Sequence, residues 1–208
     1  LMSFGIHRLW KSSLLDWLGP HPKKVLLDVA GGTGDIAALY RSRGGGKVFV
    51  CDINQSMIEA GKAKIEKKSG PGNIEWVCGD AESLPVSDRS VDAYTIAFGL
   101  RNVTSIGNAL REARRVLRPG GRFLCLEFSK PAIDFINPIY DAYSFKILPE
   151  IGNFVANDRN AYKYLVESIR KFPDQIDLEQ QINSAGLEKS SYRNLSGGIA
   201  AIHSAWRL

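Results

Sequence analysis

Short apolar segments rich in β-branched residues recur along the first two thirds of the chain. They lie at residues 24–29, 47–51, 73–78, 91–97 and 122–128. Between them the sequence has polar turns and segments with the 3.6-residue spacing of amphipathic helices. Strands that alternate with helices in this way predict a parallel sheet that is covered by helices on both faces and joined by right-handed crossovers.

Two of the connecting helices are marked by apolar spacing and by capping residues. In residues 54–68 one apolar face is set against Lys and Glu residues, and Asn54 is available as the N-cap. The next helix follows Thr104, its expected N-cap, and is expected to stop at Pro119-Gly120-Gly121. The apolar faces comprise Met57, Ile58, Gly61 and Ile65 in the first helix, and Ile106, Ala109, Leu110, Ala113, Val116 and Leu117 in the second.

The pattern changes after the fifth predicted strand. Residues 131–171 are rich in Tyr, Phe and Ile, are interrupted by prolines, and predict a helical cap inserted at this point. The earlier rhythm resumes with a helix at residues 174–185 and two strands near residues 187–193 and 199–206. Because no repeat or linker interrupts this order, residues 1–208 are predicted to form one α/β domain with a seven-stranded, mostly parallel sheet.

Composition restricts the possible functions only weakly. The chain is 44% hydrophobic and 24% charged, as is ordinary for a globular domain, and no apolar run approaches the roughly 18 residues that span a bilayer. The net charge of +5 comes from Lys and Arg spread along the chain, which favours a solvated surface over a nucleic-acid partner. Cys51, Cys78 and Cys125 are interpreted as small core residues in a reducing compartment. No His/Cys cluster has metal-ligand spacing, so no metal is expected.

Acidic residues and glycines stand where the predicted strands end. Asp28 closes the first strand, and Gly32 and Gly34 lie in the following turn, where a missing side chain lets a ligand approach the backbone. Residues 32–37 also satisfy the relaxed dinucleotide fingerprint G-x-G-x-x-G/A. Asp52 ends the second strand about 20 residues later, where a carboxylate can accept hydrogen bonds from both ribose hydroxyls. These features fit a dinucleotide and an adenosyl nucleoside equally well.

A third acid favours the nucleoside. Asp80 ends the third strand, where it can accept a hydrogen bond from an adenine amino group. Three acids at successive strand ends leave little provision for a pyrophosphate, whereas S-adenosylmethionine carries a sulfonium cation and no phosphate. Turn or cap chemistry explains any one of these acids equally well, but it is a weaker explanation for all three.

Several motifs resemble one enzyme family. The chain is similar to the class I S-adenosylmethionine-dependent methyltransferases, and among them to the ubiquinone and menaquinone biosynthesis C-methyltransferases. LDVAGGTGD is shared by the whole superfamily, whereas LMSFGIHRLW, FGLRNV and RVLRPGGRFLCLEFS are far more specific. Ala30 stands where the broader class usually has Gly, as expected within this family. The matching segments are residues 1–10, 27–35, 51–54, 98–103, 115–129 and 164–169.

The resemblance implies a Rossmann-like class I methyltransferase fold with a lid helix in residues 1–22 and a helical substrate cap in residues 131–171. It implies S-adenosylmethionine as the cofactor, with Thr33 and Gly32 touching its amino acid moiety. The implied substrate is a lipid, 2-methoxy-6-polyprenyl-1,4-benzoquinol in ubiquinone biosynthesis, with demethylmenaquinol in menaquinone biosynthesis as a further acceptor. The expected cofactor-binding residues are Asp28, Gly32, Thr33, Gly34, Asp52, Asp80, Ala81 and Ala97.

The implied reaction places its catalytic residues just after the fourth strand. A hydroquinone that loses a phenolic proton pushes electron density onto the ortho carbon, which attacks the methyl group in line. Arg101 is expected to stabilise the developing phenolate, and Asn102 to orient the ring hydroxyl. The alternative that both residues only hold the loop stays open. Tyr143, Tyr162 and Tyr164 of the cap are expected to line the substrate site, although an aromatic stripe can equally be core.

The histidines are weaker candidates. His7 is expected to pack beside Trp10 rather than act as a base or close the lid. His203 is expected in the core or lining the substrate, and His21 in a loop.

A lipid substrate also implies contact with a membrane surface. Arg111, Arg114, Arg115 and Arg118 on one helix are candidates to rest on anionic lipid, against the default of a solvated face. The protein is expected on the matrix side of the mitochondrial inner membrane, or membrane-associated in a bacterial cytoplasm, as a homodimer or in a quinone-biosynthesis complex. A catalytically weak scaffold in such a complex and, less favoured, an NAD-dependent dehydrogenase are the alternatives.

Overall fold

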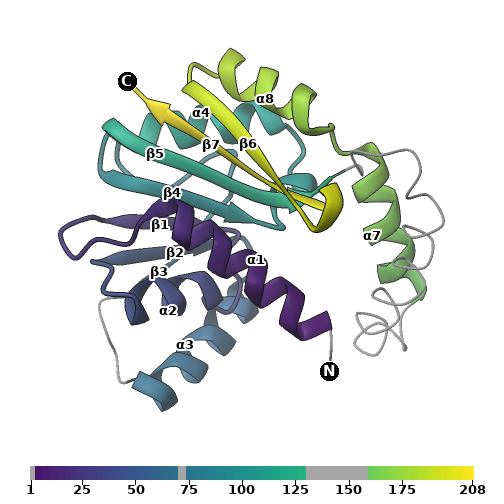
Figure 1. Ribbon diagram of the computed structural model, residues 1–208. Coiled ribbons are helices and arrows are strands. Elements are labelled where there is room, and N and C mark those ends of the chain that lie inside the picture. Colours follow the sequence, from purple (N-terminus) through teal and green to yellow (C-terminus); the bar gives the residue numbers. More distant parts are fainter. Residues whose placement is uncertain (1–2, 70–73, 130–158) are drawn as a thin grey trace.

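A central sheet organises the chain, and its strand order defines the fold (Figure 1). The computed structural model describes residues 3–69, 74–129 and 159–208. The strands are β1 (Leu26–Val29), β2 (Val48–Asp52), β3 (Ile74–Cys78), β4 (Val91–Ala97), β5 (Leu117–Phe128), β6 (Glu188–Leu195) and β7 (Ala200–Arg207). In these residues they form a seven-stranded sheet in the order β3-β2-β1-β4-β5-β7-β6. Only β7 runs antiparallel to its neighbours β5 and β6, which confirms the predicted mostly parallel sheet.

Helices cover both faces of this sheet, as predicted. The helices are α1 (Ser3–Leu18), α2 (Asp35–Ser42), α3 (Gln55–Ser69), α4 (Ile106–Val116), α7 (Arg159–Lys171) and α8 (Gln175–Ser184), with 3-10 turns η1 (Leu100–Asn102) and η3 (Ser196–Gly198). Residues of α1 and α2 share one apolar cluster with Leu26 and Leu124, and residues of α4 and α8 share another with Leu27 and Phe123. Neighbouring residues of one strand thus enter opposite cores, because strand side chains alternate between the two faces.

The caps of the two predicted helices differ in outcome. Asn54 caps α3 as expected, since its Oδ1 accepts a hydrogen bond from the Ser56 amide at 3.0 Å. Thr104 is not the cap of α4, and that prediction is wrong. The Ser105 hydroxyl accepts from the Asn108 amide at 3.3 Å instead. Both residue types have the required oxygen, so only the position of the first turn could separate them.

The helix α4 also ends earlier than the glycine pair predicts. Leu117 already has an extended backbone and pairs with Val91, so β5 begins there rather than at Arg122. Pairing with β4 therefore stops the helix before Pro119 is reached.

Two side chains expected in the core are exposed. Cys51 and Cys125 are buried as predicted, whereas Cys78 is exposed. Cys78 is the last residue of β3, which is an edge strand. Met57, placed by its spacing on the apolar face of α3, is 40% exposed because it lies in the first turn of that helix, beyond the strand ends.

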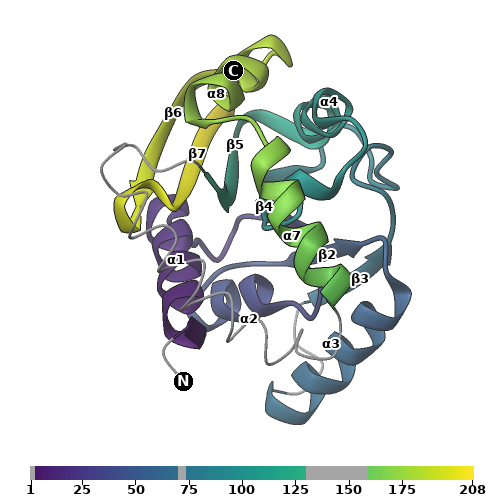
Figure 2. The ribbon, with the colours of Figure 1, turned by 90° about the vertical axis from the view of Figure 1, so that its right-hand side faces the viewer.

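The predicted lid helix is built into the core. In α1 the side chains of Trp10, Leu14 and Leu15 are buried against the sheet, and Trp10 Nε1 donates to Ser196 Oγ at 3.0 Å. Of the predicted cap at residues 131–171, residues 131–158 lie outside the described residues, and residues 159–171 form α7. Helix α7 contacts η1 and lies beyond the carboxyl ends of the parallel strands (Figure 2).

The loops that follow β1 and β4 pack against each other at Ala30 and Gly99. Ala30 follows β1 with a φ of 51°, a left-handed conformation that costs free energy in any residue with a Cβ. A Cβ on Gly99, which follows β4, would lie 2.3 Å from the Ala30 Cβ. Ala30 is therefore compatible with the fold only because residue 99 lacks a side chain.

This contact predicts a rescue between two positions. Gly99→Ala should destabilise the protein by about 1–3 kcal/mol, as overpacking usually does, although its own φ of −119° suits alanine. Adding Ala30→Gly should restore most of the loss, because it removes the opposing methyl group. Urea unfolding of the two single variants and the double variant measures the coupling.

Gly107→Ala is the matched control, since the new Cβ would meet only the flexible end of Arg111, at 3.4 Å. It should be neutral or stabilising. Equal stability losses for Gly99→Ala with and without Ala30→Gly would show that the loops do not meet as described.

Candidate active site

The carboxyl ends of β1 to β4 meet along one edge of the sheet. There β1 is flanked by β2 on one side and β4 on the other, so chain order reverses at β1. Such a switch point is where open α/β sheets bind their ligands. Asp28 pairs in register with Thr95, and Asp52 with Cys78. The structure thus brings together at this edge the predicted residues Asp28, Gly32, Thr33, Gly34, Asp52, Asp80, Ala81 and Ala97.

Asp28 is a buried carboxylate with only one oxygen paired. It is 1% exposed, and its Oδ1 accepts from the Thr95 hydroxyl at 2.8 Å. Its Oδ2 is buried and has no hydrogen-bond partner among the described residues. Burial raises the pKa of Asp28 to about 7, and the Thr95 hydroxyl and Lys11 only partly offset this. This oxygen is therefore suited to a ligand that carries a positive charge or donates a hydrogen bond.

Asp52 links the loop that follows β1 to the loop that follows β2. Its Oδ2 accepts from the Gly32 amide at 2.8 Å and its Oδ1 from the Asn54 amide at 2.9 Å. Each carboxylate oxygen has a second lone pair, so both can still accept a ligand hydroxyl. The residue is half-buried at the end of β2, and its contact to ribose stays a prediction.

The two predicted glycines of the turn serve different purposes. Gly34 is buried beneath Trp76 of β3, where a Cβ would lie 2.7 Å from the ring. The space left by its missing side chain is therefore filled by Trp76 rather than open to a ligand, and its assignment to cofactor binding stays a prediction. Gly32, with a φ of 55°, is half-exposed, and a Cβ there would face only the end of Met57 at 3.3 Å.

Exposed apolar side chains border the acids, and sequence reasoning did not identify them as part of the site. Ile53 directly follows Asp52 and is 71% exposed, and Met57 lies one turn further on. Asp80 is exposed nearby, its Oδ1 accepting from the Glu82 amide at 2.9 Å, and Ala81 is buried behind it. An apolar surface beside carboxylates suits the flat face and polar edge of a nucleobase.

Asp35 connects three helices through ion pairs beside the turn that contains Gly32. It opens α2 and accepts from Lys11 of α1 at 2.9 Å and from Lys64 of α3 at 2.7 Å. Burial alone would raise the pKa of Asp35, but the two lysines outweigh it and lower the pKa to about 2. These residues fix the turn between Gly32 and α2 relative to the covering helices.

Arg101 is joined to a buried acid that sequence reasoning missed. Its Nη1 donates to Glu127 Oε1 at 2.6 Å, with the two side chains 10% and 1% exposed. The backbone amides of Arg101 and Phe128 also donate to Glu127. Burial raises the pKa of Glu127, against the opposing effect of Arg101. A charged residue inside the apolar strand sequence FLCLEF was the available signal, since such a residue requires a partner.

Asn102 and Tyr164 were predicted in separate roles and lie together. The Tyr164 hydroxyl donates to Asn102 Oδ1 at 3.4 Å, which joins α7 to η1. Tyr164 is 57% exposed, so it does not belong to the core. Tyr143 lies outside the described residues, and Tyr162 lies in α7 without a described side chain.

The histidines follow the favoured interpretations. The His7 ring packs 5.1 Å from Trp10 and 5.4 Å from Phe98, measured between ring centroids. His203 is buried in β7, with Nε2 2.9 Å from the Gln175 carbonyl oxygen. His21 is exposed, and its Nδ1 accepts from the Lys23 amide at 3.2 Å. None of these four contacts places an imidazole against Arg101 or Asp28.

Comparisons with known proteins bear on this arrangement. The sequence matches the ubiE/COQ5 methyltransferase family over residues 1–207. It is 53% identical to the ubiquinone/menaquinone biosynthesis C-methyltransferase UbiE of Paracoccus denitrificans, covering 100% of this chain and 84% of that protein. A protein of the same name from Acidiphilium cryptum is 52% identical with the same coverage. The crystal structure of an S-adenosylmethionine-dependent methyltransferase from Aquifex aeolicus shares the fold, with a TM-score of 0.67, 17% identity and 100% of both chains covered.

The ion pair between Arg101 and Glu127 predicts that removing one charge costs more stability than removing both. Glu127→Gln keeps an oxygen for the two amides but leaves a nearly buried guanidinium without a counter-charge, which should cost about 3 kcal/mol. Arg101→Met added to Glu127→Gln should recover part of that loss, because no unpaired charge then remains. Urea unfolding tests this, and strictly additive losses would contradict a functioning pair.

Proposed function

The chain belongs to the ubiE/COQ5 methyltransferase family, and we propose that it methylates a ring carbon of 2-methoxy-6-polyprenyl-1,4-benzoquinol and of demethylmenaquinol. It is an S-adenosylmethionine-dependent C-methyltransferase of ubiquinone and menaquinone biosynthesis. The full-length similarity to enzymes of that name carries this conclusion. The geometry supports it, because the switch point combines a buried, half-paired carboxylate on β1 with a cationic side chain in the loop that follows the neighbouring strand β4.

The residues at the switch point fit S-adenosylmethionine. The buried Oδ2 of Asp28 has no partner in the described part of the chain and can face the positively charged methionine end, next to Gly32 and Thr33. Asp52 retains lone pairs for ribose, and Ile53 offers an apolar surface for adenine. When bound, the cofactor supplies a methyl group on a positively charged sulfur, which makes that methyl group open to attack by carbon.

The chain's own residues prepare the quinol. Arg101 holds a positive charge just past β4, where it can stabilise a ring oxygen that has lost its proton. Glu127 fixes one edge of that guanidinium, so the remaining N–H groups keep a set direction. Asn102 offers an amide to the ring hydroxyl, and Tyr164 restrains that amide from α7. These roles require orientation and charge rather than a nucleophilic side chain.

We place the enzyme at a membrane surface, because its prenylated substrate resides in lipid. None of the described helices is long and apolar enough to cross a bilayer. We propose association with the cytoplasmic surface in a bacterium, or with the matrix side of the mitochondrial inner membrane in a eukaryote. A homodimer or a quinone-biosynthesis complex is the proposed assembly.

A methyl-transfer assay tests the reaction and separates an enzyme from an inactive scaffold. With S-adenosylmethionine labelled in the methyl group and a short-chain demethylated quinol, we expect label on a ring carbon of the product. Mass spectrometry and NMR of the isolated quinol locate the label. Label on a hydroxyl oxygen, or no transfer at all, would contradict C-methylation.

In the same assay Arg101→Lys tests the role of the guanidinium. Lysine keeps the charge beside Glu127 but loses the planar group of N–H donors, so kcat should fall at least about tenfold. The cofactor Kd and the unfolding midpoint should stay near wild type. Unchanged kcat would reduce Arg101 to a residue that holds the loop.

The raised pKa of Asp28 predicts pH-dependent cofactor binding. A cation at Oδ2 requires ionised Asp28, and with a pKa of about 7 the ionised fraction rises about tenfold between pH 6 and pH 8. Cofactor affinity should therefore strengthen by about that factor as pH rises, with proton release in the lower half of the range. Calorimetry in buffers of different ionisation enthalpy measures both.

Asp28→Asn should abolish this pH dependence. Asp80→Asn is the control, since it should weaken binding while the pH dependence of Asp28 stays in place. A wild-type affinity that does not change between pH 6 and pH 8 would show that Asp28 does not face the bound cation.

A further inference from the structure

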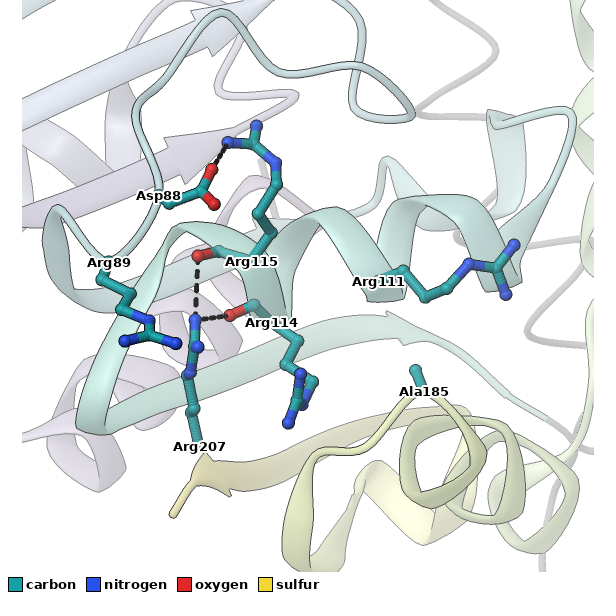
Figure 3. A pocket seen from close by; sticks show the side chains of 7 residues that line it. All are labelled: Asp88, Arg89, Arg111, Arg114, Arg115, Ala185 and Arg207. Carbon is teal, nitrogen blue, oxygen red and sulfur yellow. Dashed lines mark hydrogen bonds and ion pairs between the residues drawn. The ribbon is translucent and has the colours of Figure 1, made fainter.

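A second candidate site lies at the amino ends of the parallel strands. A cavity of about 310 Å³ is lined by Asp88, Arg89, Arg111, Arg114, Arg115, Ala185 and Arg207 (Figure 3). Arg89 immediately precedes β4, and Arg207 pairs with Gly121 near the start of β5. These residues mark the amino ends of the parallel strands, whereas the methyl-transfer site occupies the carboxyl ends. We call this feature the arginine cavity.

The acids near the arginine cavity are already paired. Arg115 Nε donates to Glu112 at 2.6 Å and Arg115 Nη1 donates to Asp88 at 2.6 Å. Figure 3 shows Arg115 turned away from Arg207 toward Asp88, and Arg111 directed along α4. The expectation that Arg111, Arg114, Arg115 and Arg118 lie on one helix is wrong for Arg118, and their contact with anionic lipid stays a prediction. Arg115 is turned inward, and Arg118 lies on β5, paired with Asp92 at 2.9 Å.

Besides Arg111, which is directed along α4, three guanidinium groups of the cavity remain without an acidic partner. Among the described residues, Arg89, Arg114 and Arg207 form no ion pair. Arg207 is 8% exposed, and its Nη1 is held by the carbonyl oxygens of Arg114 at 2.6 Å and Leu117 at 2.8 Å. Arg114 Nε donates to the Gly186 carbonyl at 2.9 Å, which leaves its two terminal nitrogens free to bind a ligand.

Like charges gather at the cavity, and a bound anion would offset them. Burial lowers the pKa of Arg207, and the nearby Arg89 and Arg114 lower it further, against the opposing effect of Asp88. Arg89 is held there with a φ of 48°, a left-handed backbone that is costly for arginine. Capping the carboxyl end of α4 accounts for Arg207, but it does not account for Arg89 and Arg114 beside it.

We propose that the arginine cavity is an anion site that binds a phosphate group through Arg89, Arg114 and Arg207. Planar guanidinium groups match the paired oxygens of phosphate, and three of them balance a dianion. The volume leaves room for a small organic group attached to the phosphate. A phospholipid headgroup and a free phosphorylated molecule share this chemistry.

Inorganic phosphate is the first probe. In thermal unfolding at constant ionic strength, phosphate should raise the midpoint of the wild-type protein above that in chloride. The Arg89→Gln/Arg114→Gln double variant should bind phosphate at least about tenfold more weakly in calorimetry, because charge-assisted hydrogen bonds are lost. Arg118→Gln removes an exposed charge outside the cavity and should leave phosphate binding unchanged.

Vesicles distinguish the two sources of the phosphate. If the occupant is a lipid headgroup, binding to phosphatidylglycerol-containing vesicles should need Arg89 and Arg114 and should be displaced by phosphate, with no binding to phosphatidylcholine alone. If it is a free molecule, phosphate should bind while vesicle binding is equal in the wild type and the double variant. No phosphate-specific shift in the wild type, or an equal loss in Arg118→Gln, would overturn the proposal.

Discussion

Burying a carboxylate in a protein interior costs free energy unless a cation or several donors face it, and the methyl-transfer site is built around two such groups. Glu127 is paired with Arg101 and with two backbone amides, so its charge is compensated inside the fold. Within the described part of the chain, Asp28 accepts a hydrogen bond from one neutral hydroxyl only. The two acids therefore suit different roles: the paired acid orients Arg101, and the half-paired acid is suited to a charged ligand.

The backbone around these acids is shaped by close contacts rather than by loop freedom. Ala30 keeps its left-handed conformation opposite the bare Cα of Gly99, and Gly34 lies under Trp76. Asp52 links the turn at Gly32 to the start of α3, and Asp35 links α1, α2 and α3 through two lysines. Each loop of the site is thus held by another loop or helix, which is the preorganisation required when the substrate carbon, and no protein side chain, is the nucleophile.

The carboxyl ends and the amino ends of the parallel strands carry side chains of opposite charge. At the carboxyl ends Asp28, Asp52 and Asp80 gather around the proposed site for a cationic methyl donor. At the amino ends Arg89, Arg114 and Arg207 gather around the arginine cavity. A phosphate group bound there would lie at the opposite ends of the parallel strands from the methyl-transfer site. It would therefore anchor the protein or regulate it rather than take part in the reaction.

Periodicity was sufficient for the α/β sheet, and the common direction of parallel strands was sufficient to gather Asp28, Asp52 and Asp80 at one set of strand ends, because both depend on local spacing. The family followed from the resemblance of longer sequence motifs. The order of β6 and β7, the partner of Arg101 and the contact of Asn102 with Tyr164 join residues far apart in the chain. No local pattern encodes such pairs. The role of Gly34, the exposure of Met57 and Cys78, and the charge cluster at Arg207 likewise depend on which surfaces the fold covers. Burial and partner choice are properties of the packed chain, so only the tertiary structure decided them.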